Sequence, residues 1–251
     1  MALLVTVNDD KPFLVDSILS ELGERGLKIK AVFHPIFKVK RDTKGLFKNI
    51  VFDGGDGAAE SMICIAFSRP GGADQLADIE TGVGRVLSSV AVAVADWKAM
   101  LARLDESIVD LEKHPPKAPR EEIDESLTFL KWLKDHHFTL LGCRDYVFES
   151  DDGGRLLPVA ESGLGLLRDP ERRVIRHGGN RAALTPEVRA FLMQPSPLII
   201  TKSIERSPVH RRVQEDYIGV KRFDGSGKLV GERRFVGLFT SIAYSESPRQ
   251  I

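Results

Sequence analysis

The chain has 251 residues, which is enough for one large domain or two ordinary ones with separate hydrophobic cores, and we expect two. Its 36 basic and 36 acidic residues cancel, which argues against a long-range field that would gather nucleic acid or an anionic membrane. The longest apolar stretch, residues 86–97, is too short to span a bilayer, and two cysteines make no disulfide framework, so we expect a cytoplasmic protein.

The chain opens with a strand followed by a helix. Residues 3–7 form an apolar β run, and residues 13–22 carry the broad apolar face of a helix. Between them, Asp10 is a suitable N-cap and Pro12 suits the first helical turn. Such a corner gathers free backbone N–H groups at the positive end of a helix, an arrangement that suits a carboxylate.

Three further β runs follow at residues 27–40, 46–52 and 61–68, the first with Pro35 at a bulge or an edge. From residue 73 to about residue 111 the apolar period is helical. This order is most of a βαββαβ unit, the ferredoxin-like arrangement, with its final strand missing or displaced. Four apolar residues of the long helix either close the local core or form an exposed patch for a partner: Val86, Val90, Val94 and Trp97.

The second half of the chain is rich in β patterns. Residues 114–120, HPPKAPR, contain three prolines and predict a linker, and a second amphipathic helix follows at residues 121–136. The turn DGSG joins two long alternating runs at residues 216–223 and 228–241, which predicts an antiparallel hairpin. The predicted fold class is α+β, with two antiparallel-sheet modules. The predicted domains are residues 1–113, the linker 114–120 and residues 121–251.

Several blocks of sequence then stand in a specific order from Val5 to Tyr244: VNDDKPFLVDSILSELGERGL, HPIFKVKRD, LLGCRDY, GLGLLRD, TKSIERSPVHRR and DYIGVKRFDGSGKLVGERRFVGLFTSIAY. In this order they resemble the amino-terminal region of the large bacterial NAD-dependent glutamate dehydrogenases. The resemblance implies an ACT-type module, then a PAS-like sheet domain, with the catalytic domain far downstream. We therefore expect this chain to be a piece of a larger polypeptide.

The resemblance also implies that the opening corner corresponds to the loop where related ACT modules bind amino acids. Ligand-binding loops of this type have a glycine after the proline, whereas this chain has Phe13, a ring large enough to fill the pocket. The residues support two interpretations, a capped tight turn or an amino-acid site. The candidate effector-binding residues are Asn8, Asp9, Asp10 and Phe13.

The most basic short stretch, SPVHRR, follows Arg206 and is the second candidate site. It either grips a carboxylate or phosphate, or forms a solvated or interdomain salt-bridge surface. The candidate residues are Arg206, His210, Arg211 and Arg212. We expect no metal site, because His136, His137 and Cys143 match no standard zinc spacing. We expect no catalytic residues either, because neither a nucleotide-binding loop nor a nucleophile–base pair is present.

The sequence thus favours a noncatalytic regulatory and scaffolding fragment of such a dehydrogenase. The fragment is expected to bind no cofactor. The resemblance implies that NAD is the cofactor of the parent enzyme and that the parent reaction is the conversion of glutamate to 2-oxoglutarate and ammonia. The expected partners are the downstream catalytic domain, further copies in a homo-oligomer and an amino-acid effector, with neither nucleic acid nor membrane among them. The alternative is a free-standing amino-acid sensor that acts on other proteins.

Overall fold

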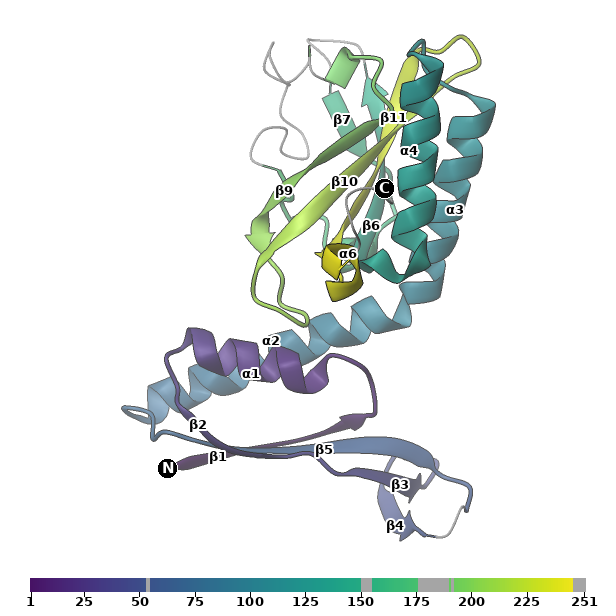
Figure 1. Ribbon diagram of the computed structural model, residues 1–251. Helices are drawn as coiled ribbons and strands as arrows, with labels where there is room; N and C mark the ends of the chain where they lie inside the picture. Colours follow the sequence, from purple (N-terminus) through teal and green to yellow (C-terminus); the bar gives the residue numbers. More distant parts are fainter. Residues whose placement is uncertain (53–54, 150–154, 176–189, 191, 246–251) are drawn as a thin grey trace. The chain divides into compact units, whose positions relative to one another are not determined.

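The computed structural model of the chain describes residues 1–52, 55–149, 155–175, 190 and 192–245. These residues form two antiparallel sheets flanked by helices, so the predicted α+β class is confirmed (Figure 1). The chain divides into two compact units: residues 1–91 with residues 208–212, and residues 92–207 with residues 213–251. Residues 208–212 are called the strap below. Within the described ranges, no helix is long and apolar enough to cross a membrane.

The first unit has a five-stranded sheet in the order β1-β5-β3-β4, with β2 also paired to β5. Its elements are β1 Ala2–Asp9, α1 Leu14–Glu24, β2 Ile29–Phe33, β3 Ile36–Arg41, β4 Phe47–Val51, β5 Ala58–Phe67 and α2 Ala73–Ala95. Both helices lie on one face of the sheet (Figure 1), which is the predicted ferredoxin-like arrangement. The core contains fully buried side chains of α1 and β5, namely Ile18, Leu22, Ile63 and Ile65.

Pro35 divides the strand that the sequence predicts over residues 27–40. Proline has no backbone N–H and cannot continue a ladder, so β2 ends at Phe33 and β3 begins at Ile36. Both pieces pair with β5, and the Pro35 carbonyl accepts a hydrogen bond of 3.0 Å from the Met62 N–H between them.

The single long helix predicted over residues 73–111 consists of two helices, α2 and α3 Trp97–Lys113, separated at Asp96. Val86 and Val90 are buried, whereas Trp97 is 47% exposed. The apolar side of α3 belongs to the core of the second unit, and the boundary between the units therefore falls within α2. The predicted linker, residues 114–120, connects α3 to α4 Arg120–Trp132 inside the second unit.

The sheet of the second unit has the order β7-β6-β11-β10-β9, with β8 also paired to β6. Its strands are β6 Phe138–Glu149, β7 Arg155–Pro158, β8 Leu164–Gly165, β9 Leu198–Arg206, β10 Gln214–Phe223 and β11 Leu229–Phe239, and the short helix α6 Ser241–Ser245 follows. Helices α3 and α4 pack on one face of this sheet over Ile218 and Phe235. The likeness to a PAS sheet stays a prediction.

The predicted DGSG turn joins β10 to β11. The Asp224 carboxylate accepts hydrogen bonds from the backbone N–H groups of Ser226 and Lys228, at 2.8 and 3.0 Å, and Gly227 has φ 79°. The hairpin prediction is therefore confirmed. The predicted helix over residues 121–136 is shorter than expected, because α4 ends at Trp132 and His136 adopts a left-handed φ of 61°.

Candidate functional site

Phe13 completes the corner between β1 and α1. It is the N-cap residue of α1 and lies in the left-handed region, with φ 71° and ψ −3°. No side chain caps this helix end, so the prediction that Asp10 is the N-cap is wrong. Asp10 instead extends the β1–β5 ladder, because its N–H donates to the Ala59 carbonyl at 2.9 Å. The corner therefore has three residues, 11–13, between the sheet and the helix.

The predicted effector residues do not all face one way. Neighbouring residues of a strand point to opposite faces, so Asn8 faces the helices and Asp9 faces away from them. The Asn8 Nδ2 atom is buried and has no hydrogen-bond partner among the described residues. Asp9 pairs with Lys11 at 2.9 Å, and the Lys11 hydrogen bond lowers the pKa of the Asp9 carboxyl. Of Asn8 and Asp9, only Asn8 lies on the face of the sheet that α1 covers.

The strap is hydrogen-bonded to the beginning of α1. The His210 N–H donates to Ser17 Oγ at 2.8 Å, and Ser20 Oγ donates to the His210 carbonyl at 3.3 Å. The His210 ring lies 5.3 Å from the Phe13 ring, and its Nδ1 atom lies 3.1 Å from an oxygen of Asp16. Phe13 and His210, members of two sets that the sequence predicted separately, are thus in contact.

Further contacts anchor the strap at both sides of His210. Val209 is fully buried, and Arg212 lies 3.3 Å from the Glu24 carboxylate and 3.7 Å from the Glu21 carboxylate. Carboxylates of α1 therefore already face the charged group of Arg212. The structure divides the predicted basic cluster, because Arg211 is exposed and Arg206 ends β9 in the second unit.

Ser17 and Ser20 are contacts that the sequence analysis missed. Ser17 is buried at 1% exposure, and its hydroxyl also contacts the Phe13 carbonyl. A signal was present, since two small hydroxyl residues three positions apart interrupt the apolar face of this helix. Together with Phe13, these serines contact the strap where it meets α1.

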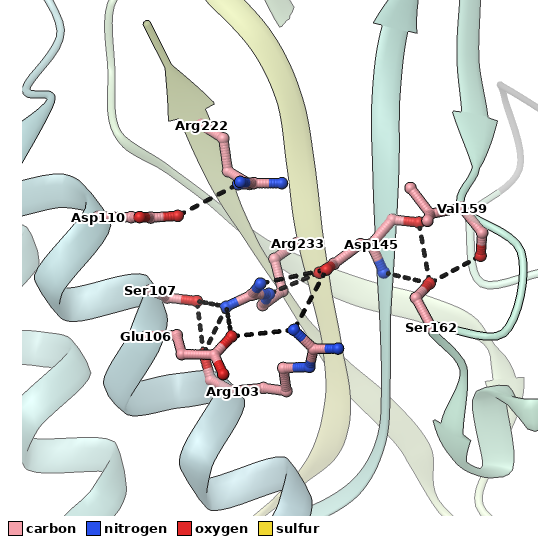
Figure 2. Close-up of polar contacts among 9 residues, drawn as sticks. All are labelled: Arg103, Glu106, Ser107, Asp110, Asp145, Val159, Ser162, Arg222 and Arg233. Carbon is pink, nitrogen blue, oxygen red and sulfur yellow. Dashed lines mark hydrogen bonds and ion pairs between the residues drawn. The ribbon is translucent and has the colours of Figure 1, made fainter. Parts of the chain in front are cut away.

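The second unit buries a cluster of charged side chains between its sheet and α3 (Figure 2). Arg233 is 3% exposed and donates to the Asp145 carboxylate at 2.5 and 3.1 Å, while the Glu106 carboxylate lies 3.1 Å away. Burial alone would lower the pKa of Arg233, but the Asp145 hydrogen bonds raise it above its ordinary value. The Arg103 carbonyl also accepts from Arg233, at 2.9 Å. The charged groups of the cluster are bonded to one another, as expected of a structural ion network.

A second buried group lies on the opposite face of the same sheet. Arg234 donates to Glu232 at 3.0 Å and its guanidinium lies 3.8 Å from the centre of the Tyr146 ring, while the Tyr217 hydroxyl donates to Glu232. Burial raises the pKa of Tyr217 well above its usual range. The signals for both groups were the charged residues inside strand patterns, in CRDY and GERRF.

Other residues offer little chemistry. Burial raises the pKa of the Cys143 thiol to about 12, so the thiol stays protonated and unreactive. In the ranges that the structure describes, no three His, Cys, Asp or Glu side chains gather as a metal site would require. Residues 151–152, an acidic pair that the sequence places in a hairpin loop, lie outside the described residues.

A groove of about 1180 Å³ is lined by α4 and β9. Phe129, Trp132 and Ile200 supply apolar lining. Four carboxylates also line it: Glu121, Glu122, Asp124 and Glu125. These carboxylates repel another carboxylate or a phosphate. The groove is therefore a poorer candidate for an amino-acid carboxylate than the corner between β1 and α1.

Comparison with known proteins adds an independent line of evidence. Residues 3–83 match the family model described as the ACT1 domain of glutamate dehydrogenase. The chain is 37% identical over 251 residues to the NAD-specific glutamate dehydrogenase of Pseudomonas aeruginosa, and 33% identical over 253 residues to that of Halomonas elongata. For the enzyme of Mycobacterium tuberculosis the identity is 28% over 260 residues. These alignments cover 98% to 99% of this chain but only 14% to 16% of the relatives.

Proposed function

We propose that this chain, whose residues 3–83 match the ACT1 domain model of glutamate dehydrogenase, is a noncatalytic regulatory and scaffolding part of a large NAD-dependent glutamate dehydrogenase. The whole cytoplasmic enzyme deaminates glutamate oxidatively to 2-oxoglutarate and ammonia, with NAD and the catalytic domain in the rest of the polypeptide. Relatives with this name, of which the chain spans about 15%, support the proposal.

The observation that carries a regulatory role is the hydrogen bond from the His210 N–H to Ser17 Oγ. His210 lies in the strap, which together with Ser207 and Val213 joins β9 to β10, and a bond of 2.9 Å from the Ser207 N–H to the Val213 carbonyl closes the base of that loop. Because the loop is this short, it absorbs little of a displacement along the chain. A rearrangement at the beginning of α1 therefore acts on β9 and β10 through the backbone itself.

The proposed effector is an amino acid whose carboxylate binds at the beginning of α1. Ser17 Oγ and the first-turn N–H groups are suitable donors, and the buried Asn8 Nδ2 lacks a partner within the described ranges. The Ser17 hydroxyl now donates to the Phe13 carbonyl and accepts from the His210 N–H, so the effector competes with Phe13 for the hydroxyl hydrogen and with the strap for the space beside Ser17. The effector then shifts the population from a strap-bound to a strap-free arrangement, which the catalytic domain senses.

Titration of the chain with each common amino acid tests this proposal, by calorimetry and by the shift of the melting temperature. At least one amino acid should bind at millimolar concentration, and Ser17→Ala should weaken this binding. His210→Ala should strengthen it, because it removes the ring contacts with Phe13 and Asp16 that help to hold the strap. Ser88→Ala is the matched control, since Ser88 is a helical serine on α2 whose hydroxyl donates to the Gly84 carbonyl of its own helix, at 3.0 Å. The absence of heat and of any melting shift would remove the effector.

The noncatalytic part of the proposal has its own test. Incubation of the chain with glutamate and NAD should produce no NADH, because the proposal assigns NAD and the catalytic domain to the rest of the polypeptide. NADH formation by the purified chain would overturn it.

A further inference from the structure

The sheet of the first unit has an open edge at β1. All eight residues of β1 pair with β5, from Ala2 opposite Phe67 to Asp9 opposite Glu60. In the described part of the chain β1 pairs with no other strand. A complete βαββαβ unit places its last strand beside the first one, but here α2 leads into α3 instead. The final strand of the βαββαβ unit, which the sequence analysis found missing or displaced, is therefore absent from its usual position beside β1 in the described residues.

Backbone groups of alternate β1 residues point to this open edge. The Asp10 N–H donates to the Ala59 carbonyl directly opposite, which fixes the hydrogen-bonding phase of the β1–β5 ladder. In an antiparallel pair, hydrogen-bonded and outward-facing residues alternate. The even-numbered residues of β1 therefore bond to β5. Leu3, Val5 and Val7 direct their N–H and C=O groups away from β5.

This edge lacks the features that keep exposed strands from pairing. Residues 2–7 contain no charge and no proline, and the β1–β5 register shows no bulge. The side chains of Leu3, Val5 and Val7 are 65%, 47% and 53% exposed on the face that the helices leave uncovered. A long, apolar edge without a bulge is a template for another strand.

We propose that β1 pairs antiparallel with β1 of a second copy of this chain, which joins the two first-unit sheets into one. The sequence of the strand is self-complementary about Val5. A two-fold axis at Val5 places Leu3 opposite Val7 of the other copy, and Val5 opposite Val5. All three residues have outward-facing backbone groups, so the two ladders are in phase, and their apolar side chains form one continuous row. Asp9 and Lys11 lie beyond the paired segment.

This inference is independent of the effector and of any catalytic role. It predicts that the isolated chain dimerises, which light scattering measures from micromolar to millimolar protein. Val5→Pro removes an N–H that faces the open edge while sparing every bond to β5, so the variant should be folded and monomeric. Val5→Thr retains the N–H and the branched shape and should dimerise.

A charge exchange tests the register itself. Val5→Lys and Val5→Glu each place two like charges at the two-fold axis, so each variant alone should be monomeric. A mixture of the two should form the mixed dimer. A monomeric wild-type chain, a dimer that persists in folded Val5→Pro, or a mixture that stays monomeric would each overturn the inference.

Discussion

The rings of Phe13 and His210 lie 5.3 Å apart, and both residues hold a left-handed backbone, with φ 71° and 66°. For a residue with a Cβ, this conformation costs about 1 kcal/mol. Two such residues in contact persist only because their surroundings fix them. Here these surroundings include the Ser17 hydroxyl, which contacts both the Phe13 carbonyl and the His210 N–H.

Substitutions at Phe13 should separate the backbone strain from the ring contact. Phe13→Ala loses the ring but keeps the strained conformation, whereas Phe13→Gly loses the ring and relieves the strain. In denaturant titrations, we expect the free energy of unfolding of the glycine variant to exceed that of the alanine variant by about 1 kcal/mol. In both variants the His210 amide should exchange its hydrogen faster than in the wild type. An alanine variant as stable as the glycine variant would contradict the left-handed backbone at this residue.

The corner shows what the sequence alone could and could not predict. Apolar periodicity placed β1 and α1 correctly, because it depends on neighbours along the chain. The cap at Asp10 was wrong, since pairing with Ala59 retains that residue in the sheet. The contact between Ser17 and His210 joins residues 193 positions apart through a backbone N–H, which no local pattern encodes.

The core of the second unit shows a different limit. The charges at Asp145 and Arg233 lie inside strands, and a strand pattern does not tell which face is buried. The helical stripe of residues 97–111 predicted burial but not which sheet it covers. It packs on the second sheet, so the compositional linker after it does not mark the boundary between the cores.

Asp145→Ala should be strongly destabilising, because it removes the buried carboxylate of Arg233 and leaves the half-exposed Glu106 as the remaining carboxylate beside the guanidinium. Loss of one partner of a buried ion pair costs about 3 to 5 kcal/mol. The control is Asp110→Ala, which breaks the half-exposed pair of Asp110 and Arg222 at 3.3 Å and should cost less than about 1 kcal/mol. Urea denaturation followed by circular dichroism measures both variants. Equal losses would show that Arg233 finds other compensation.

Glu215 should make the stability of the second unit depend on pH. The side chain is fully buried, and burial raises its pKa to about 7 from 4.5, although Arg172 at 2.7 Å opposes the shift. The folded state therefore holds the proton more tightly than the unfolded state. The resulting stability is present below pH 4.5 and is lost as the pH rises through about 7.

Glu215→Gln removes this ionisation while keeping the size of the side chain. As the pH rises from about 4.5 to about 8, the unfolding free energy of the variant should increase by roughly 2 to 3 kcal/mol relative to that of the wild type. Glu125→Gln, on the exposed side of α4, controls for the loss of one negative charge. Parallel pH curves for Glu215→Gln and the wild type would mean that Arg172 holds Glu215 ionised throughout.

Gly219 tests the packing around the buried Glu232. A Cβ atom at this position would overlap the Glu232 carboxylate and lie 3.0 Å from the Tyr217 hydroxyl oxygen. Both groups are fully buried and bonded to each other, so neither moves without losing a partner. Gly219→Ala should therefore lower the free energy of unfolding by about 1 to 3 kcal/mol, as overpacked cores do.

Gly225→Ala is the matched control, because a Cβ atom there would meet no atom within 4 Å. It should change the free energy of unfolding by less than about 0.5 kcal/mol. Replacing a glycine by alanine also reduces the freedom of the unfolded chain, which favours folding in both variants. The measured loss of unfolding free energy in Gly219→Ala is therefore smaller than the destabilisation that the overlap with Glu232 causes. If both variants are equally stable in denaturant titrations, the carboxylate does not occupy the space beside Gly219.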